Sequence, residues 1–378
     1  ATVLDAGKVV ATAVVPLQEQ FDRWSDITPR ETGTVSLAVP NARLWSPEDP
    51  YLYDLVLCLR RGDETVDEVK TYFGMRKVHV ADGQFFLNNR RYYQRLVLDQ
   101  GYWAEGLYTA PSAESIRRDV ELIKAMGFNG VRKHQKIEDP YFYYYCDKLG
   151  LLVWSEMPAA YEFSEEGARS VMYEWQAAVR RDRNHPCIVA WVPLNESWGV
   201  DVLNERTCPR AEAHLMALYY ATHALDGTRP VISNDGWHQV RTDIVTIHEY
   251  TQDADDLAAR LRRFLEDSHY VAFSHDRPVL LPGYEVDGAA ILLTEFGGTK
   301  VEAPEVDGWG YGQAAKDYEE MAQRLRALVD AVLSVPRIQG FCYTQLTDVQ
   351  QEVNGLLTID RRPKLPLDLL RSIFARWV

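Results

Sequence analysis

The segment Cys187-Ile-Val-Ala-Trp-Val-Pro-Leu-Asn-Glu196 is a nearly unbroken apolar run that ends in an amide and a carboxylate. A second apolar run, Ala289-Ala-Ile-Leu-Leu293, leads through one threonine into Glu295. Continuous runs of this length are typical of strands that are buried on both faces, as in parallel sheets. The two glutamates lie 99 residues apart, and a β/α barrel uses roughly 30 residues for each strand with its helix. The spacing therefore predicts two carboxylates at strand ends, three units apart in a barrel.

Eight short apolar runs alternate with amphipathic stretches from Gly83 to the end of the chain. Such alternation is typical of βα units around a parallel sheet. Ser112 and Asp139-Pro140 are helix-start signals, and an apolar stripe within residues 313–332 indicates a long helix. We therefore predict an α/β fold, a TIM (β/α)8 barrel over residues 78–378, with an open parallel sheet as the alternative. The expected strands are 93–98, 130–133, 151–154, 188–194, 231–234, 244–249, 291–294 and 338–344.

Up to residue 77 the pattern is different, because short alternating runs are separated by turn residues. Strands are expected at 9–15, 33–39 and 51–59, followed by a turn at 61–63 and a further strand that begins at Thr71. We predict a partial immunoglobulin-like β-sandwich in residues 1–77, with few strands for a complete one. The chain starts at Ala1 inside a β pattern, so we expect that an upstream piece is missing.

Composition argues against several classes of partner. The net charge is −14 and no basic stripe is present, so we expect neither nucleic acid nor an anionic membrane surface as a partner. No apolar run reaches the roughly 18 residues that cross a bilayer. The five cysteines are scattered and form no C-x-x-C pair, which indicates buried thiols in a reducing, cytoplasmic compartment. His134, His248 and Glu249 lack the i, i+4 spacing of a metal pair, so we predict no metal and no cofactor.

Functional side chains of a barrel gather at the C-terminal ends of its strands. Here those ends are rich in carboxylates, amides and aromatic rings, which suit the hydroxyls and the apolar face of a sugar. Two carboxylates on different strand ends are also what hydrolysis of a glycosidic bond requires. We therefore expect a carbohydrate substrate. The residues at the strand ends are Asp99, Trp103, Lys133, Gln135, Glu156, Asn195, Glu196, Asn234, Trp237, His248, Tyr250, Glu295, Gln345 and Asp348.

Several of these segments together resemble glycoside hydrolase family 2, which includes β-galactosidases, β-glucuronidases and β-mannosidases. Arg183-Asn-His-Pro-Cys-Ile-Val-Ala-Trp-Val-Pro-Leu-Asn-Glu196 resembles the acid/base segment of that family. Residues 44–53 and 73–77 are similar to its immunoglobulin-like domain and the junction with the barrel. The matching blocks Asn129-Gly-Val-Arg132, Cys146-Asp-Lys-Leu-Gly150 and Thr294-Glu-Phe-Gly297 extend the resemblance over essentially the whole chain.

The resemblance implies that Glu196 is the general acid/base and that Glu295 is the nucleophile. It also implies that Asn195 bonds the sugar 2-hydroxyl and that Tyr250 contacts the nucleophile. Retaining enzymes place the two carboxyls about 5–5.5 Å apart. Trp191 and Trp198 lie near in sequence, and we expect apolar surroundings that raise the pKa of Glu196. Further substrate contacts are expected from Asp99, Arg132, Gln135, Trp237, His248 and Gln345.

Some of these residues have two interpretations. Arg132 fits a structural ion pair as well as a substrate contact, whereas for Trp237 and Trp103 sugar stacking is favoured over packing. Gln135 stands where relatives usually carry a sugar-binding histidine, and Gln345 where they commonly carry a tryptophan. These departures leave the sugar open.

The leading prediction is a retaining exo-β-glycosidase that acts on a terminal β-linked sugar and is most similar to β-galactosidases. Lys133, Lys136 and Lys300 keep a uronic acid, and thus a β-glucuronidase, as an alternative. A non-catalytic carbohydrate-binding barrel is the alternative from a different class. After Glu156 the chain lacks the Asn-Ile-Glu that helps to hold magnesium in some β-galactosidases. Relatives are commonly dimers or tetramers, so the resemblance implies a homo-oligomer, and without an upstream domain residues 1–378 are expected to fold but to be inactive.

Overall fold

The computed structural model describes residues 1–378 except 21–29, 33, 201–207, 272–275, 303–307, 377 and 378. The chain divides into two compact units, Ala1–Met75 and Arg76–Val378. The first unit contains a four-stranded antiparallel sheet and a two-stranded ribbon. The sheet has the order β2 (Lys8–Thr12), β1 (Thr2–Asp5), β5 (Tyr53–Arg61) and β6 (Glu64–Phe73), and the ribbon pairs β3 (Gln18–Gln20) with β4 (Arg30–Thr32).

Two strand predictions in this unit are wrong. Residues 34–39 form no strand, because their backbone makes no ladder with any strand in the described part of the chain; Gly33 lies outside the described residues. Thr71 does not begin a strand but lies near the end of β6. The first eight residues of β6 are exposed on both faces, so they show no alternation for a sequence pattern to detect.

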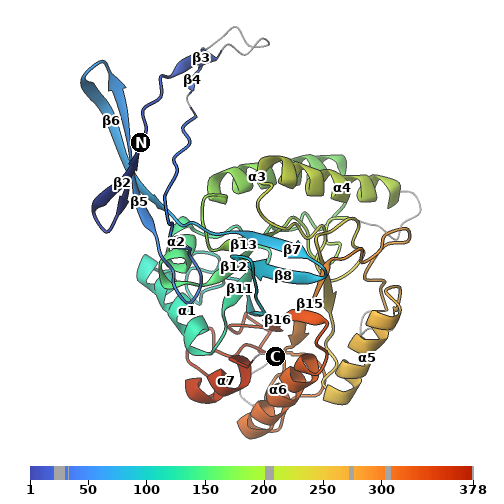
Figure 1. Cartoon of the computed structure of the whole chain (residues 1–378). Coiled ribbons are helices and arrows are strands. Elements are labelled where there is room, and N and C mark those ends of the chain that lie inside the picture. The colour runs from blue at the N-terminus through green and yellow to red at the C-terminus, as the bar shows by residue number, and fades with distance from the viewer. Residues whose placement is uncertain (21–29, 33, 201–207, 272–275, 303–307, 377–378) are drawn as a thin grey trace. The chain divides into compact units, whose positions relative to one another are not determined.

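The second unit is the predicted barrel, and its sheet contains seven parallel strands (Figure 1). Nearly all residues of these strands are buried, which explains why the sequence shows continuous apolar runs. The order around the sheet is β13 (Ile188–Val192), β12 (Leu152–Glu156), β11 (Gly130–Lys133), β10 (Gln94–Asp99), β16 (Ile338–Thr344), β15 (Ala290–Gly297) and β14 (Ile244–His248).

The fifth predicted strand, 231–234, is present only as isolated parallel bridges, and it fills the gap between β13 and β14. Toward β13 its backbone pairs normally, since Ile232 N donates to Trp191 O at 2.9 Å. Toward β14, one backbone hydrogen bond, from Asp243 N to Val231 O, reaches the segment. Beyond this bond, side chains take the place of further backbone hydrogen bonds. Gln239 Nε2 donates to Thr246 O at 2.7 Å, and Gln239 Oε1 accepts from Thr246 N at 3.2 Å. We call this junction between residues 230–235 and β14 the seam.

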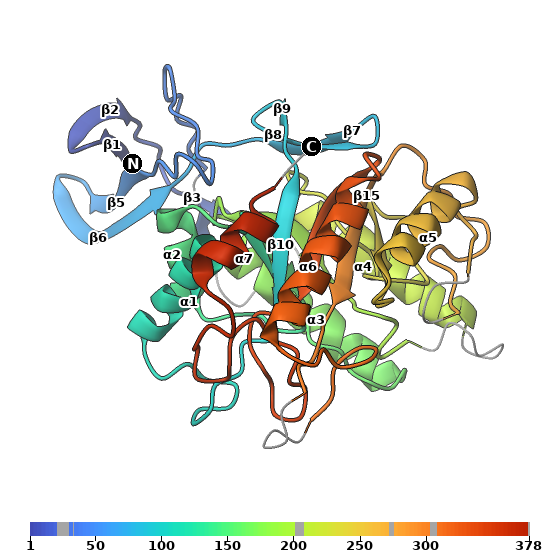
Figure 2. The same ribbon diagram turned by 90° about the horizontal axis from the view of Figure 1, so that it is seen from below.

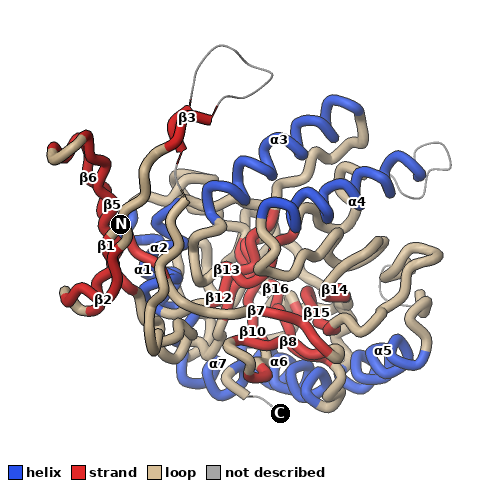
Figure 3. Tube along the Cα trace, turned by 45° about the horizontal axis from the view of Figure 1, so that its top comes forward, coloured by secondary structure: helices blue, strands red, loops and turns tan. Residues whose placement is uncertain are grey.

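Helices surround the strands of the barrel on the outside (Figures 1 and 3). The predicted N-caps are confirmed, because Ser112 accepts from Ser115 N and Asp139 accepts from Tyr141 N. The last long helix begins later than predicted, because Asp317 caps it. No helix within the described residues is both long and apolar enough to cross a membrane. The helices are α1 (Ala113–Ala125), α2 (Pro140–Leu149), α3 (Glu165–Asp182), α4 (Cys208–Leu225), α5 (Ala254–Glu266), α6 (Tyr318–Leu333) and α7 (Leu367–Phe374).

A β-hairpin that the sequence did not predict closes the end of the barrel at which the strands begin (Figure 2). It consists of β7 (Val78–Ala81), β8 (Gln84–Leu87) and the short β9 (Arg90–Arg91). Gly83 at its turn donates to Gly288 O at 2.8 Å, just before β15, and accepts from Arg337, just before β16. Because the hairpin blocks this end, the opposite end is left for substrates.

Replacing Gln239 with alanine should destabilise the barrel. Gln239 is fully buried, and its amide satisfies both backbone groups of Thr246. Leaving two buried backbone groups unpaired costs about 2–4 kcal/mol. We therefore expect Gln239→Ala to lower the urea midpoint followed by tryptophan fluorescence. Gln323→Ala on the exposed face of α6 is the control, and equal midpoints for the two variants would show that the amide does not hold the seam.

Candidate active site

The two glutamates singled out by the sequence meet at the C-terminal end of the barrel. Glu196 follows β13, Glu295 lies in β15, and His248 ends β14 opposite Glu295. One carboxylate oxygen of each glutamate and a ring nitrogen of His248 all lie within 4.8 Å of one another. The structure thus brings together two residues that are separated by 99 positions in the chain.

A strained turn aims Glu196 into the site. Glu196 and Ser197 have φ values of +52° and +62°, a left-handed conformation that costs each non-glycine residue about 1 kcal/mol or more. Two neighbours hold this turn, since Glu196 N donates to Asp235 O at 2.9 Å and Ser197 N donates to Asn234 Oδ1 at 3.0 Å. Asn234 and Asp235, in the segment beside β13, therefore hold the backbone of this turn in place.

The surroundings of Glu196 are more polar than the sequence suggested. Its Oε1 lies 2.7 Å from His248 Nδ1, and its Oε2 accepts from Trp198 Nε1 at 3.3 Å. Trp191 does not contribute, because its indole donates to Asp226 at 2.8 Å and packs edge-on against Trp175. Trp191 is a core residue on the outward face of β13, packed against α3, and supplies no apolar wall beside Glu196.

Glu295 is held by a cation and a phenol. Arg132 Nη1 donates to Glu295 Oε1 at 2.7 Å, and the Tyr250 hydroxyl donates to Oε2. Burial and the charge of Glu295 raise the pKa of Tyr250 well above its usual value, so the phenol keeps its proton and remains a donor. Donors and a cation of this kind stabilise the charge on a carboxylate.

Arg132 is the centre of the buried network. It is fully buried, and its Nε contacts Glu156 Oε2 at 2.7 Å and Asp235 Oδ2 at 2.8 Å. Its Nη2 donates to Asn195 Oδ1 at 2.7 Å. Burial alone would lower the pKa of Arg132, but the charges of Asp235, Glu156 and Glu295 raise it well above its usual value. Of the two interpretations of Arg132, these contacts favour the structural ion pair.

His248 connects the two glutamates. Its Nδ1 lies 3.5 Å from Glu295 Oε2 as well as 2.7 Å from Glu196, and its Nε2 lies 3.3 Å from Asp235 Oδ2. Burial disfavours the charged ring, but the charges of Glu295 and Asp235 raise the pKa of His248 to about 10. The imidazole is therefore protonated at neutral pH.

Trp237 is packed inside the protein, although the sequence favoured stacking of its ring on a sugar. Its side chain is only 6% exposed, and its Nε1 donates to Glu196 O at 3.0 Å. The ring meets the edge of His248, and the Arg277 guanidinium lies 4.9 Å from its centroid. Trp103 is half-buried, and the Arg361 guanidinium lies 3.5 Å from the centroid of its ring. These contacts favour packing for Trp237.

The other predicted contacts differ in how much they face the opening. Asp99 is buried in an ion pair with Lys133 Nζ at 2.7 Å, and Gln345 is buried against Asn354 and Gln100. Gln135 is only half-buried, and its backbone N donates to Glu156 Oε1 at 2.8 Å. It helps to line a recess of about 130 Å³ together with Gln100, Tyr102, Tyr108, His134, Pro158, Ala159 and Tyr161.

Asp235 is a site residue that the sequence reasoning missed. Its neighbour Asn234 is the residue predicted at this strand end, and Asp235 lies one residue further along. Gly236 offers a signal in retrospect: it has φ +95°, and a Cβ there would lie 2.6 Å from His248 Nδ1. Only glycine fits at this position, so the Asn-Asp-Gly turn marks the approach of the chain to the site.

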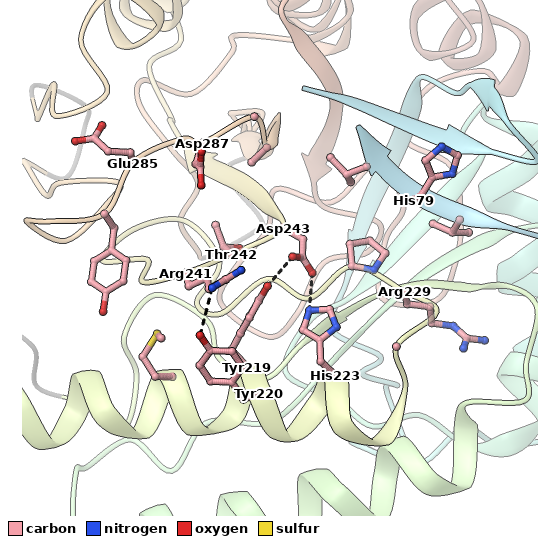
Figure 4. Close-up of a pocket in the computed structure, with 18 of the residues that line it drawn as sticks. His79, Tyr219, Tyr220, His223, Arg229, Arg241, Thr242, Asp243, Glu285 and Asp287 are labelled. Carbon is pink, nitrogen blue, oxygen red and sulfur yellow. Dashed lines mark hydrogen bonds and ion pairs between the residues drawn. The ribbon is translucent and has the colours of Figure 1, made fainter. Parts of the chain in front are cut away.

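Among the described residues, Glu196, His248 and Glu295 form the one group whose spacing would suit a metal ion. One of the three, Glu295, is already paired with the guanidinium of Arg132 at 2.7 Å. A separate recess of about 820 Å³ lies between α4 and β7 (Figure 4).

Comparison with known proteins identifies the family. Residues 78–377 match the family model described as the TIM barrel domain of glycosyl hydrolases family 2, and residues 4–76 match a second model of glycosyl hydrolases family 2. The chain therefore belongs to glycosyl hydrolase family 2.

Relatives within the family carry different names. A β-galactosidase of Vibrio cholerae is 32% identical over 59% of this chain and 21% of its own length. A β-galactosidase of Pseudoalteromonas haloplanktis is 27% identical over 90% of this chain and 32% of its own length. The solved β-glucuronidase of Bifidobacterium dentium has a TM-score of 0.78 and 23% identity, covering 99% of this chain and 60% of the solved one. This chain thus spans at most a third of the two curated relatives.

Removing the cation at the centre of the site should be costly. Arg132→Met leaves Glu156, Asp235 and Glu295 without their shared partner, and an uncompensated buried charge costs about 3–5 kcal/mol near pH 7. Arg132 holds the pKa of Glu156 and Asp235 below their usual values against burial, so their contribution to stability is complete above about pH 4.5 and lost below it.

Without Arg132, burial would raise these carboxyl pKa values instead. The folded variant would then take up protons more readily than the unfolded chain, and the stability gap to the wild type should narrow from about pH 7 to about pH 4.5. Urea unfolding at several pH values measures this gap. A gap that stays constant across the range would contradict the account, and Arg117→Met, at an exposed ion pair on α1, should change stability by less than about 0.5 kcal/mol.

Proposed function

We propose that the protein is a retaining β-glycosidase in which Glu295 is the nucleophile and Glu196 is the general acid/base. The observation that carries this proposal is the approach of the two carboxylates to within 4.8 Å. Retaining enzymes hold their carboxyls about 5–5.5 Å apart, whereas inverting enzymes need about 6.5–9.5 Å to admit a water molecule between them. Membership of glycosyl hydrolase family 2 supports the same chemistry.

The different neighbours of the two carboxylates support the division of roles. Glu295 receives hydrogen bonds from Arg132 and Tyr250, which suits a group that must attack as an anion. Glu196 has the more exposed side chain, 16% against 6%, so it faces the side from which a leaving group departs and water enters. A site with both groups in place gives no support to a non-catalytic barrel.

The reaction then proceeds in two displacements. Glu295 attacks the anomeric carbon and forms an ester while the bond to the leaving oxygen breaks and Glu196 gives that oxygen its proton. Glu196, now a carboxylate, takes a proton from water, and the resulting hydroxide attacks the anomeric carbon. The ester bond to Glu295 breaks, the carboxylate is regenerated, and the sugar leaves with its configuration retained.

Asn195 is suited to bind the sugar beside Glu295. Its Oδ1 accepts from Arg132 Nη2 at 2.7 Å, which fixes the amide plane and turns the amino group away from the guanidinium. We assign this amino group to the 2-hydroxyl of the substrate, a contact that strengthens in the transition state.

A neutral sugar suits the site better than a uronic acid, and a β-galactoside is the first candidate. Lys133 contacts Asp99 and Glu138, and Lys136 contacts Glu138 and two backbone carbonyls. Lys300 donates to Gly308 O at 2.5 Å. These three predicted partners for a sugar carboxylate are therefore engaged with the protein.

Replacing Glu295 and replacing Glu196 in the protein should lower activity by amounts that depend differently on the leaving group of the substrate. Glu295→Gln should lower kcat at least about a hundredfold on every substrate, because no ester can form. Glu196→Gln should be as severe on an alkyl β-glycoside but milder on a dinitrophenyl β-glycoside, whose leaving group needs no proton. Initial rates on both substrates measure this.

The control for this pair is Glu174→Gln on the exposed face of α3, which should leave both rates unchanged. If both active-site variants kept more than about a tenth of the wild-type rate, the two roles would be assigned to the wrong residues.

The choice of sugar can be tested on nitrophenyl β-galactoside, β-glucoside, β-mannoside and β-glucuronide. We expect kcat/KM for the β-galactoside to exceed that for the β-glucuronide at least about tenfold, since burying an unpaired carboxylate is unfavourable. Preference for the β-glucuronide would overturn the neutral-sugar assignment but not the mechanism. Turnover of none of the four would contradict the proposed function.

A further inference from the structure

Asp235 occupies a place in the network that the proposed reaction does not use directly. Its backbone O accepts from Glu196 N, and its backbone N donates to Leu194 O at 2.9 Å, so it lies beside the turn that carries Glu196. Its carboxylate is fully buried between Arg132, His248 and Thr294. The three contact distances are 2.8 Å from Arg132 Nε, 3.3 Å from His248 Nε2 and 2.8 Å from Thr294 Oγ1.

A fourth buried carboxylate in this cluster needs a reason, because Glu156, Glu196 and Glu295 are already close together. Arg132 would still have Glu156 and Glu295 as partners without Asp235. His248 would not have an equivalent partner, because Asp235 is the one acidic group among the described residues that contacts its Nε2. The residue that depends on Asp235 most directly is therefore His248.

The charged groups around His248 come from every side of the site. Glu196 follows β13, Glu295 lies on β15, and Asp235 ends the segment beside the seam. Arg132 on β11 faces the ring only through Asp235 and Glu295, and Arg277 lies beyond the ring of Trp237. With Nε2 directed at Asp235, the other nitrogen, Nδ1, faces Glu196 Oε1 at 2.7 Å.

We propose that Asp235 is a positioning residue that keeps a proton on His248 and thereby sets how readily Glu196 holds its own proton. This inference rests on the proposed function, since it concerns the residue that adjusts the acidity of the general acid/base in that reaction. The chain of contacts is Asp235 to His248 Nε2, then His248 Nδ1 to Glu196 Oε1. A cationic donor on Glu196 favours its carboxylate form, which is the form that activates water in the second displacement.

Asp235→Asn keeps the size of the side chain and removes its charge. His248 then loses one of the two carboxylates whose charges raise its pKa, so it should lose its proton at a lower pH. A neutral ring is a weaker donor to Glu196, and Glu196 should hold its proton to a higher pH. Since the first displacement needs protonated Glu196, the alkaline limb of kcat/KM should move up by about 1 pH unit.

The experiment compares pH profiles of the full-length wild type and Asp235→Asn on the β-glycoside that the protein hydrolyses best. Alongside the shift of the alkaline limb, kcat should fall at least about tenfold with KM changed less than about threefold, because Asp235 does not face the substrate. NMR titration of the His248 ring gives a readout that does not depend on turnover, and its pKa should fall in the variant.

The chain offers a matched control at the other end of the barrel. Asp243 also accepts from a histidine, His223 Nε2 at 2.8 Å, and from the Tyr219 hydroxyl at 2.7 Å (Figure 4). Asp243→Asn should therefore reduce stability without moving either limb of the pH profile. His248→Gln is the second test variant, and it should move the alkaline limb in the same direction as Asp235→Asn.

Each outcome decides one of the two proposals. If Glu295→Gln still turns substrate over, the proposed function fails. If Glu295→Gln and Glu196→Gln lose activity as expected but the profile of Asp235→Asn superimposes on the wild type, only the role of Asp235 is overturned. Should Asp235→Asn fail to fold, an unchanged alkaline limb in His248→Gln overturns it, and a raised limb supports it.

Discussion

The guanidinium of Arg132 holds together the end of the barrel at which the two glutamates meet. Four parts of the chain bring acceptors to it: the ends of β12, β13 and β15, and the segment beside the seam. Burying an uncompensated carboxylate costs several kcal/mol, so three carboxylates can share this site only because one planar cation binds all of them. Parallel strands supply the geometry, since all their C-terminal ends converge on the same opening.

Within this shared network the two glutamates have different neighbours. Glu295 faces a cation and a phenol that keeps its proton, whereas Glu196 faces an imidazole and an indole. The barrel thus separates two identical side chains by their surroundings, and this is the usual way in which one fold carries out acid and base chemistry together. The strained backbone of Glu196 is part of the same arrangement, because Asn234 and Asp235 hold it from the adjacent segment.

The barrel and the position of its two carboxylates could be predicted from the sequence because both depend on local patterns. Buried parallel strands appear as apolar runs, and Glu196 and Glu295 directly end such runs. Asp235 could not be found in this way, since its importance comes from contacts with Arg132 and His248, which are distant in sequence. The environment of Glu196 was misjudged for the same reason: Trp191 is close along the chain, but its strand points it outward.

Elements whose pairing depends on partners were also harder to predict. The segment 231–234 has a strand-like sequence, but toward β14 one backbone hydrogen bond, from Asp243 N to Val231 O, takes the place of a ladder. The run up to Val39 alternates correctly, yet residues 34–39 pair with no strand that the structure describes. Conversely, the β7–β8 hairpin was not predicted, because its short strands are buried only by docking across the start of the barrel.

The barrel is less stiff along the seam than between its other neighbouring strands. A backbone ladder resists sliding at every residue, whereas the amide of Gln239, which lies on the loop before β14, bonds Thr246 of that strand and can tilt about its own torsions. Glu196 lies on one side of this line, and His248 and Glu295 lie on the other. The distance between Glu196 and Glu295 can therefore change most easily by movement at the seam. The other strands, joined by backbone ladders, hold the rest of the opening fixed.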